Sequence, residues 1–484
     1  MASVEATTGA AGGAPVRRLT FILCGVLAAH LAIQGLLLAA GTRWKHTVLH
    51  ESVDGLVLGR GGVWIDSWGP MSFAEELARG STTPLYAELF WRQRIKFIYP
   101  ATSLPVITVA RTVVSDDFVA MERALRRVSL VMVLMTALAT AWILLHATPA
   151  GTGTGTGTGT GAGAGAGTGA GAGAGARGWA HSAAQVALVC ALTGLFYPVV
   201  KAYTLGQLQS WINALFAVAL ACWLGGRRAT AGALLGVICL WKPQYGLLLG
   251  WGALRRQWRF VSALAAVVVA GLLLSLTLYG PEDHRGYLGV LSHLGRHGEA
   301  YIPNQSLNGL LQRLWRNGDA LRWWPDRYPP YRAAIFGLTS ALALLGLGAA
   351  LWLPRRSARA GGVADLGLFV VTLTVVSPIA WEHHHGVLLP LYAWLLARAG
   401  SERWLGRATW PVLGGSFAAA ASYLWLARRV VWPLGPLLQS LLLGAALVVA
   451  LLLALALRRA PVMAAGSAHR AAPALRVGDT PRSG

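Results

Sequence analysis

The stretch from Leu19 to Ala40, LTFILCGVLAAHLAIQGLLLAA, contains no charged side chain. It is slightly longer than the roughly 20 residues that an α-helix needs to cross the apolar core of a bilayer. It also exceeds the roughly 7–15-residue apolar core of a secretion signal, so we interpret it as an uncleaved membrane anchor. Arg17 and Arg18 precede this stretch, which favours a cytoplasmic N-terminus and an extracytoplasmic position for the residues that follow.

The rest of the chain repeats this apolar pattern. Of its 484 residues, 55% are hydrophobic and 12% are charged, whereas a soluble protein carries about 25% charged residues. The sequence therefore predicts an all-α polytopic membrane protein with about 10–13 transmembrane helices, whose long first extracytoplasmic loop carries interfacial helices. The further apolar segments are residues 100–114, 128–147, 182–199, 208–225, 229–252, 258–279, 332–353, 364–380, 386–399, 408–426 and 434–457.

The formal net charge is +22, from 41 Lys and Arg against 19 Asp and Glu. Such a balance can indicate nucleic-acid binding. Here the cations form pairs at the ends of apolar segments, where membrane proteins place topology signals and contacts with lipid headgroups. We therefore expect membrane lipids, and not nucleic acid, as partners. The pairs are Arg17-Arg18, Arg126-Arg127, Arg255-Arg256, Arg355-Arg356 and Arg458-Arg459.

The domain organisation follows from the same pattern. The four cysteines all fall in apolar segments, which argues against a disulfide framework. Residues that alternate Gly with Thr or Ala form a low-complexity insert, which we predict to be flexible because Gly loses much backbone entropy on ordering. The predicted parts are a disordered cytoplasmic N-terminus at 1–18, a multi-pass domain at 19–457 with outer loops at 41–99 and 280–331 and the insert at 150–177, and a disordered basic cytoplasmic tail at 458–484.

The first outer loop mixes carboxylates with tryptophans and cations, and Asp66 lies within it in the sequence VWIDSW. A carboxylate at a membrane surface can act as a general base if it reaches a substrate hydroxyl. Asp66 could instead cap a helix or pair with Arg60 or Arg79. Glu51 and Asp54 are the alternative bases in this loop.

Residues 71–80 of the same loop have helical spacing. Phe73 and Leu77 share one face with Ala74 and Ala78. The segment is too short to cross a bilayer, so we predict a helix that lies at the membrane interface and ends at Gly80.

Three consecutive histidines lie between two predicted spans, in the sequence WEHHH at 381–385. Polar side chains at membrane depth are costly and usually functional. Consecutive histidines point in different directions on a helix, so a metal ion would need His383 and His385 in extended chain with Glu382 or a distant ligand. The other interpretation is hydrogen bonding of one or two ring nitrogens to a phosphate or hydroxyl group.

Lys242 interrupts an apolar run in the sequence LWKPQY at 240–245. A buried ammonium must pair, reach an interface or change its protonation. Pro243 frees backbone carbonyl groups at the same point. Lys242 therefore either faces an anionic headgroup or phosphate, or extends to the membrane interface.

Side-chain amides occur in Gly206-Gln207 and in Asn304-Gln305. Amides suit hydroxyl-rich ligands because they both donate and accept hydrogen bonds. Counting spans from a cytoplasmic N-terminus puts Gln207 on the cytoplasmic side. The same count puts both long loops and the histidine segment on the extracytoplasmic side, which predicts a site there.

The order of these segments resembles that of glycosyltransferase family 87, integral-membrane enzymes of the C-type glycosyltransferase superfamily. The resemblance extends from about residue 20 to about residue 400. It is carried by Asp66 with the following helix and Gly80…Pro84-Leu85-Tyr86, by Phe97-Ile98-Tyr99-Pro100, by Gly206-Gln207, by Gly232…Leu240-Trp241-Lys242-Pro243 and Arg255-Arg256-Gln257-Trp258, by Asn304-Gln305-Ser306, and by Ser377-Pro378…Trp381…His383-His384.

The resemblance implies a plasma-membrane enzyme that moves a hexose, mannose above all, from a polyprenyl-phosphate-linked donor to an extracytoplasmic lipid or glycan acceptor. It implies Asp66 as the general base, inversion at the anomeric carbon, and no metal or other cofactor. The residues that it implies for the donor phosphate are Lys242, His383 and His384. Those that it implies for contacts with the sugar or acceptor are Tyr99, Gln207, Asn304, Gln305 and Trp381.

A different class of function fits the same hydrophobic pattern. Many spans with embedded cations are also typical of transporters and lipid-carrier flippases. Such folds are built from internal repeats, and this sequence shows none. Two long outer loops that hold most of the polar chemistry favour an enzyme that works at one face of the membrane.

Overall fold

We describe the fold from a computed structural model, in which residues 13–60, 62–80, 83–147, 170–423, 425–430 and 433–458 are described. Most of the residues predicted to be disordered or flexible, in 1–18, 150–177 and 458–484, lie outside the described residues. Where these ranges are described, they are helical, because α1 begins at Gly13, α6 begins at Ala170 and α18 ends at Arg458. The described residues form helices and no β-strand; one isolated bridge pairs Asn304 with Trp381. The prediction of an all-α protein is therefore confirmed.

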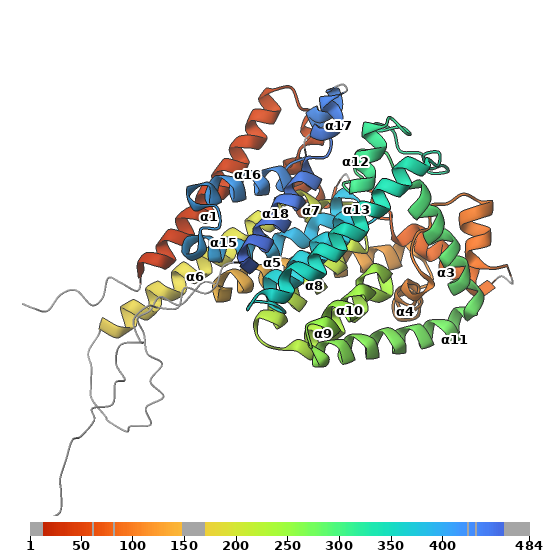
Figure 1. The fold of residues 1–484 in the computed structure, drawn as a ribbon, viewed down its shortest axis with the longest axis horizontal. Coiled ribbons are helices and arrows are strands. Elements are labelled where there is room, and N and C mark those ends of the chain that lie inside the picture. Colours follow the sequence, from red (N-terminus) through yellow and green to blue (C-terminus); the bar gives the residue numbers. More distant parts are fainter. Residues whose placement is uncertain are drawn as a thin grey trace, which may run out of the picture.

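The helices follow one another along the chain as drawn in Figure 1. The α-helices are α1 (Gly13–Ala39), α2 (Val48–His50), α3 (Trp68–Gly80), α4 (Pro105–Val113), α5 (Phe118–Ala147), α6 (Ala170–Gly194), α7 (Tyr197–Thr204), α8 (Gln209–Leu224), α9 (Arg228–Trp241), α10 (Leu247–Leu254), α11 (Trp258–His297), α12 (Leu307–Leu314), α13 (Ala333–Trp352), α14 (Val363–Val376), α15 (Leu388–Glu402), α16 (Thr409–Ala421), α17 (Leu434–Leu438) and α18 (Leu441–Arg458).

Short helical turns connect these helices. Two of them, both in the first loop, are π-helical, a geometry that often marks functional sites. The π-helical turns are η2 (Glu51–Val57) and η3 (Ala87–Arg92), and the 3₁₀ turns are η1 (Trp44–His46), η4 (Ala101–Ser103), η5 (Pro243–Gly246), η6 (Leu353–Arg356), η7 (Glu382–Val387), η8 (Gly406–Ala408) and η9 (Trp425–Arg429).

Five described helices are long and apolar enough to cross a membrane, and a sixth span results if the bent pair α6 and α7 is counted as one. Three shorter apolar helices, α8, α9 and α14, pack among them. Shorter helices can remain in the interior of such a protein because neighbouring helices, and not lipid, cover them. The chain is thus a multi-pass membrane protein, as the hydropathy predicts.

The bend between α6 and α7 changes the expected position of Gln207. The two helices meet at an angle of 60°, so the chain turns within the segment that the sequence predicts as one straight span. Counting straight spans puts Gln207 on the opposite side from Asp66, and this prediction is wrong: the Gln207 amide contacts the Asp66 carboxylate.

The loop predicted at 280–331 is more helical than the sequence suggests, because α11 continues through a kink at Gly280 as far as His297. The second part of α11 packs against the first loop. Oδ1 of Asp283 in α11 accepts a hydrogen bond from the backbone N–H of Leu85 in that loop at 2.6 Å. The Lys96 ammonium forms an ion pair of 2.8 Å with Glu299. The two outer loops are therefore packed against each other.

A buried ion pair joins the C-terminal end of α10 to the N-terminal end of α14. Nε of Arg255, after α10, lies 2.6 Å from Oδ2 of Asp365 in α14, and both side chains are buried. The indole of Trp251 and the backbone N–H of Gly361 also donate to this carboxylate, at 3.0 and 2.7 Å. The prediction that Arg255 contacts lipid headgroups is wrong, because the buried Asp365 needs a cationic partner.

Candidate functional site

The segment around Asp66 is fixed by its backbone to the end of α7. The N–H groups of Val63 and Trp64 donate to the carbonyl of Thr204, and the N–H of Asp66 donates to the carbonyl of Leu205 at 2.9 Å. These bonds join residues about 140 positions apart in the chain. The position of Asp66 is thus set by α7 and not by its own loop alone.

Gly206 allows this close approach. Its φ is +70°, and a Cβ at this position would lie 1.7 Å from the carbonyl oxygen of Trp64. Trp64 itself has a φ of +64°, which is strained for a bulky residue. Its ring is held by Tyr203 and by the guanidinium of Arg126, 3.8 Å from the ring centre. Side chains from α5 and α7 therefore hold this strained backbone in place. Strained backbone of this kind is typical of functional sites.

A hydrogen-bond network orients the Asp66 carboxylate. Nε2 of Gln207 donates to Oδ2 of Asp66. The other end of this amide, Oε1, accepts hydrogen bonds from Oγ of Ser67 at 2.7 Å and from the Tyr99 hydroxyl at 2.8 Å. Oγ of Ser67 accepts in turn from the N–H of Leu208. Because two hydroxyl groups fix Oε1, the amide N–H of Gln207 must face Asp66.

Asp66 remains accessible although protein surrounds it. Burial raises the pKa of the Asp66 carboxyl group, while the hydrogen bond from Gln207 and the charge of Lys201 lower it. A raised pKa makes a carboxylate a stronger base, which suits proton abstraction. The pairings with Arg60 or Arg79 do not form: among the described ion pairs Arg79 binds Glu75, at 2.9 Å.

Lys201 acts on the charge of Asp66, although its position in the sequence does not single it out. Nζ of Lys201 in α7 donates to Oε1 of Glu51 at 2.6 Å, and the Thr204 hydroxyl donates to the other oxygen of this carboxylate at 2.5 Å. Glu51 is thus held as the partner of a cation. A lysine five residues before Gly206 in an apolar helix is the signal that could have identified this group.

Glu382 lies next to this pair and is buried. Its Oε1 accepts a hydrogen bond of 2.6 Å from the Tyr197 hydroxyl. Burial raises the pKa of Glu382, while the nearby Lys201 charge and the Tyr197 bond lower it. Glu51, Glu382 and Lys201 therefore form one cluster of ionisable side chains that connects α7 with the start of the histidine turn.

The histidine segment is the turn η7, which leads into α15 and packs against α8. A Cβ at Gly386 would lie 2.1 Å from Nδ2 of Asn213, so the turn fits against α8 only with glycine there. His383 is buried, and neither of its ring nitrogens has a partner among the described residues. Burial, and then the positive charge of Lys242, lower the pKa of His383 and His384 well below the ordinary value, so both rings are neutral near pH 7.

His384 and Lys242 line one small cavity, with room for about one water molecule. Its remaining walls carry amides and hydroxyl groups, and no carboxylate of the described residues lines it. Gln209, the first residue of α8, contributes the positive end of that helix dipole. The cavity therefore suits one oxygen atom of an anionic group. Its lining residues are Gln209, Lys242, Gln244, Tyr245, Thr374, Ser377 and His384.

Asn304 and Gln305 are buried, just before α12. Nδ2 of Asn304 donates to the carbonyls of Glu299 and Pro378, and its Oδ1 accepts from the N–H of Ala380 at 2.9 Å. Gln305 is likewise buried and hydrogen-bonded to backbone groups, including the carbonyl of Gln439. These amides hold the chain before Trp381 in place, so the structure gives them a scaffold role in place of the expected substrate contact.

Trp381 is partly exposed at the start of the histidine turn. Its backbone pairs with Asn304, and its ring lies at the edge of Tyr301, with 6.4 Å between ring centres. An exposed indole at this position can stack on a sugar ring. In the described part of the chain, no group of three or more His, Cys, Asp or Glu side chains is arranged to hold a metal ion.

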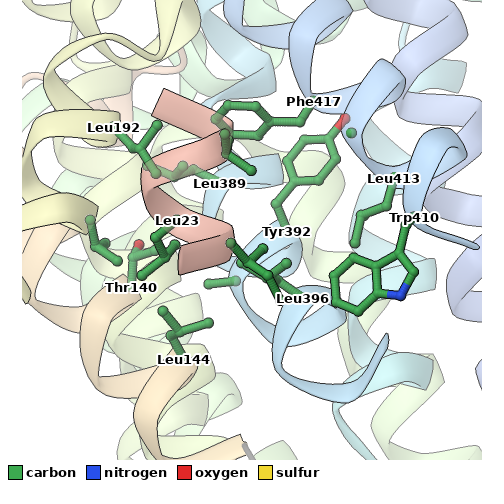
Figure 2. A pocket seen from close by; sticks show the side chains of 15 residues that line it. Leu23, Thr140, Leu144, Leu192, Leu389, Tyr392, Leu396, Trp410, Leu413 and Phe417 are labelled. Atoms are coloured by element: carbon green, nitrogen blue, oxygen red, sulfur yellow. The ribbon is translucent and has the colours of Figure 1, made fainter. Parts of the chain in front are cut away.

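A larger cavity of about 100 Å³ lies among α1, α5, α6, α15 and α16 (Figure 2). Its walls are almost entirely apolar, and the Tyr392 hydroxyl at its edge bonds to Ser416 at 2.7 Å. Figure 2 shows leucine side chains and the rings of Trp410 and Phe417 facing this space. It contains no carboxylate or cation, so it is not suited to acid–base chemistry or phosphate binding.

Five of the nine site residues predicted from the sequence form two units. Asp66, Gln207 and Tyr99 form one hydrogen-bonded unit, and Lys242 shares a cavity with His384. The two units are adjacent, because α8 follows Gln207 directly and the Lys201 charge acts on both Asp66 and His383. An oriented carboxylate next to an anion cavity can remove a proton from one reactant while the other loses an anionic group.

Comparison with known proteins agrees with this arrangement. Residues 97–378 match glycosyltransferase family 87. A polyprenol-phosphate-mannose-dependent alpha-(1-2)-phosphatidylinositol pentamannoside mannosyltransferase of Mycolicibacterium smegmatis is 28% identical over 265 residues, 52% of this chain and 59% of that protein. A polyprenol-phosphate-mannose-dependent alpha-(1-2)-phosphatidylinositol mannoside mannosyltransferase of Mycobacterium tuberculosis is 31% identical over 209 residues, 42% of this chain and 45% of that protein. No solved structure matches.

The chain spans about half the length of these curated relatives. Asp66 lies before the family match, and His383 and His384 lie just after it, whereas Tyr99, Gln207 and Lys242 lie within it. The contacts of Asp66 with Gln207 therefore connect the first loop to the matched region. Since the match covers more than half of the sequence, this chain belongs to glycosyltransferase family 87.

Proposed function

We propose that this protein is a membrane mannosyltransferase that uses a polyprenyl-phosphate-linked mannose donor and glycosylates a lipid or glycan acceptor. The observation that carries the proposal is the oriented Asp66 carboxylate next to the Lys242 and His384 cavity. Family membership and the printed activities of both relatives support the donor class.

In the first part of the reaction, the Asp66 carboxylate takes the proton of the acceptor hydroxyl. The hydroxyl oxygen attacks the anomeric carbon of the donor sugar from the side opposite the phosphate, which inverts the configuration there. Gln207 keeps one Asp66 oxygen occupied, so the other oxygen is available to the acceptor. The Tyr99 hydroxyl acts through Gln207, because it donates to the amide oxygen.

In the same step, the bond between the anomeric carbon and the phosphate oxygen breaks, and its electron pair stays on the polyprenyl phosphate. Negative charge therefore grows on this phosphate in the transition state. Lys242 and His384, which line this cavity together, are the side chains that would stabilise that charge. His383 has unpaired ring nitrogens and is available as a further donor once a ligand is bound.

We place the site at the extracytoplasmic face of the plasma membrane, on the basis of the cytoplasmic N-terminus predicted from Arg17 and Arg18. The acceptor is then a glycolipid or glycan of the cell envelope.

A transfer assay with the purified full chain tests this function against the transporter or flippase alternative. We expect mannose to move from radiolabelled polyprenyl-phosphate-mannose to an added glycolipid acceptor in detergent, where no vectorial transport can occur. Absence of transfer in detergent, together with uptake of the donor by sealed vesicles that contain the protein, would support the alternative instead.

The pH dependence of transfer should change when the positive charge of Lys201 is removed. This ammonium lowers the pKa of Asp66, so in Lys201→Gln the pKa of Asp66 rises. The carboxyl group then stays protonated at a higher pH, and the acid limb of kcat/KM shifts to higher pH than in the wild type. Lys201→Arg keeps the charge and should keep the limb in place; an unchanged limb in Lys201→Gln would contradict the coupling.

A further inference from the structure

Buried polar atoms without a hydrogen-bond partner collect where the start of α8 meets the histidine turn η7. Among the described residues, five such atoms lie there: Oε1 of Gln209, Nδ2 of Asn213, both ring nitrogens of His383 and Nε2 of His385. None of these four side chains is more than 4% exposed. An unpaired buried polar atom costs free energy, so this concentration points to a polar ligand that pairs with some of them.

The amide of Gln209 is oriented by α8 itself. Its Nε2 donates to Oδ1 of Asn213, one helical turn later, at 2.8 Å. Asn213 is confined in turn by η7, because a Cβ at Gly386 would lie 2.1 Å from Nδ2 of Asn213. Since Nε2 is used in this way, Gln209 offers its carbonyl oxygen, a hydrogen-bond acceptor, to a ligand.

This acceptor belongs to a residue that lines the small cavity of Lys242 and His384. An ionised phosphate oxygen accepts hydrogen bonds and donates none, so the Lys242 side chain can bind it and the carbonyl oxygen of Gln209 cannot. The carbonyl oxygen needs a hydroxyl or N–H group instead. A ligand that satisfies both residues therefore carries a hydroxyl group close to a phosphate.

The chain at Gln209 connects the two units of the candidate site. Gln207 contacts Asp66, and Gln209, two residues later, lines the cavity with Lys242. The backbone of this segment is fixed, because Oγ of Ser210 donates to the carbonyl of Gln207 at 2.8 Å. During transfer the anomeric carbon lies between the attacking hydroxyl and the leaving phosphate, so the donor sugar lies along this segment.

We propose that the carbonyl oxygen of Gln209 accepts a hydrogen bond from the C2 hydroxyl of the donor sugar. This proposal rests on the proposed glycosyltransferase function. C2 is the carbon next to the anomeric carbon, so its hydroxyl group is the one closest to a phosphate bound at Lys242. Hydrogen bonds to this hydroxyl strengthen when a glycosidic bond breaks. Because mannose and glucose differ only in the configuration at C2, Gln209 is then a specificity-determining residue.

Donor binding tests this contact without relying on transfer. The probes are short-chain polyprenyl-phosphate-mannose, its analogue without the C2 hydroxyl, and polyprenyl phosphate, each titrated calorimetrically into the purified full chain in detergent. We expect the wild type to bind the deoxy analogue about tenfold more weakly than the mannosyl donor, because the carbonyl oxygen then stays unpaired. Equal affinity of the wild type for these two donors would overturn the proposal.

Gln209→Met keeps the length of the side chain but removes its polar atoms. This variant should bind the mannosyl donor about tenfold more weakly than the wild type does, and should bind the mannosyl and deoxy donors equally. Its affinity for polyprenyl phosphate should stay unchanged, which also shows that the site is folded. A matching loss for polyprenyl phosphate would assign Gln209 to the phosphate, and no loss for any probe would assign its carbonyl to an internal water; either result refutes the sugar contact.

Gln257→Met is the matched control. The amide of Gln257 also donates to one acceptor, the carbonyl of Arg255, and Gln257 does not line the cavity of Lys242. This variant should bind all three probes like the wild type.

Epimeric donors test the specificity role. We expect the ratio of kcat/KM for mannosyl and glucosyl donors to fall at least about tenfold in Gln209→Met, because the residue that distinguishes the two C2 configurations is lost. An unchanged ratio would overturn this role. Absence of both donor binding and transfer in the wild type would refute the proposed function, whereas normal transfer that is insensitive to the C2 hydroxyl would refute only the Gln209 contact.

Discussion

Asp66→Asn is expected to abolish mannosyl transfer, with a loss of about 10²–10⁴-fold in kcat, the range that a general base contributes. The substitution keeps the size of the side chain but removes its ability to accept the acceptor proton. The loss should appear in kcat more than in the KM of either substrate, because the carboxylate acts mainly in the transition state. Steady-state kinetics with a polyprenyl-phosphate-mannose donor measure this.

The control for this variant is Asp319→Asn. Asp319 is a carboxylate in the second outer loop whose Oδ1 accepts hydrogen bonds from the backbone of Leu321 and Arg322, and asparagine can accept the same bonds. It should leave transfer within a few fold of the wild type. Full activity in a folded Asp66→Asn protein would remove Asp66 as the base and direct attention to Glu51, which Lys201 now neutralises.

Lys242→Gln is expected to lower kcat by about 10²–10³-fold, because the growing charge on the leaving phosphate loses its main cationic partner. The cavity that Lys242 lines contains no carboxylate of the described residues, so no protein anion there competes with a ligand for the Lys242 side chain. Inhibition by the product, polyprenyl phosphate, should weaken in parallel. Measuring both kcat and the product inhibition constant separates loss of charge stabilisation from misfolding.

A second variant, in which an exposed arginine is replaced by an uncharged residue, controls for the change in net charge. Arg259 is exposed at the start of α11, and Arg259→Gln should change neither kcat nor product inhibition. If Lys242→Gln keeps full activity and normal inhibition by polyprenyl phosphate, the anion cavity is not the donor phosphate site.

The helix α3 agrees with the local sequence pattern in its end point but not in all of its buried residues. The sequence predicts a helix ending at Gly80, and α3 does end there. Phe73, on the face expected at the membrane interface, is 41% exposed, whereas Glu75 is buried, which the spacing of the apolar residues does not predict. Glu75 can be buried because Arg79 and Arg111 approach its two carboxylate oxygens at 2.9 and 3.0 Å.

The candidate site was predictable only in part. Asp66 and Lys242 stand out in the sequence because each places a charge where its neighbours are apolar or aromatic. Lys201 lies in an equally apolar segment, yet its role depends on Glu51, 150 residues away, and on the bend before α7. Asn304 and Gln305 have the chemistry of sugar-binding amides, but backbone groups already use their polar atoms.

The sequence alone therefore determined the class of the protein: apolar runs near the length of a bilayer crossing require helices, because lipid offers the backbone no hydrogen bonds. It also determined the order of segments that is typical of glycosyltransferase family 87. Only the tertiary structure decided which polar groups meet. The contact between Asp66 and Gln207 spans 141 positions and depends on the 60° bend before α7, on the left-handed Gly206 and on the Ser67 hydroxyl. No periodicity within a single segment contains that information, because the bonds form between segments that fold separately.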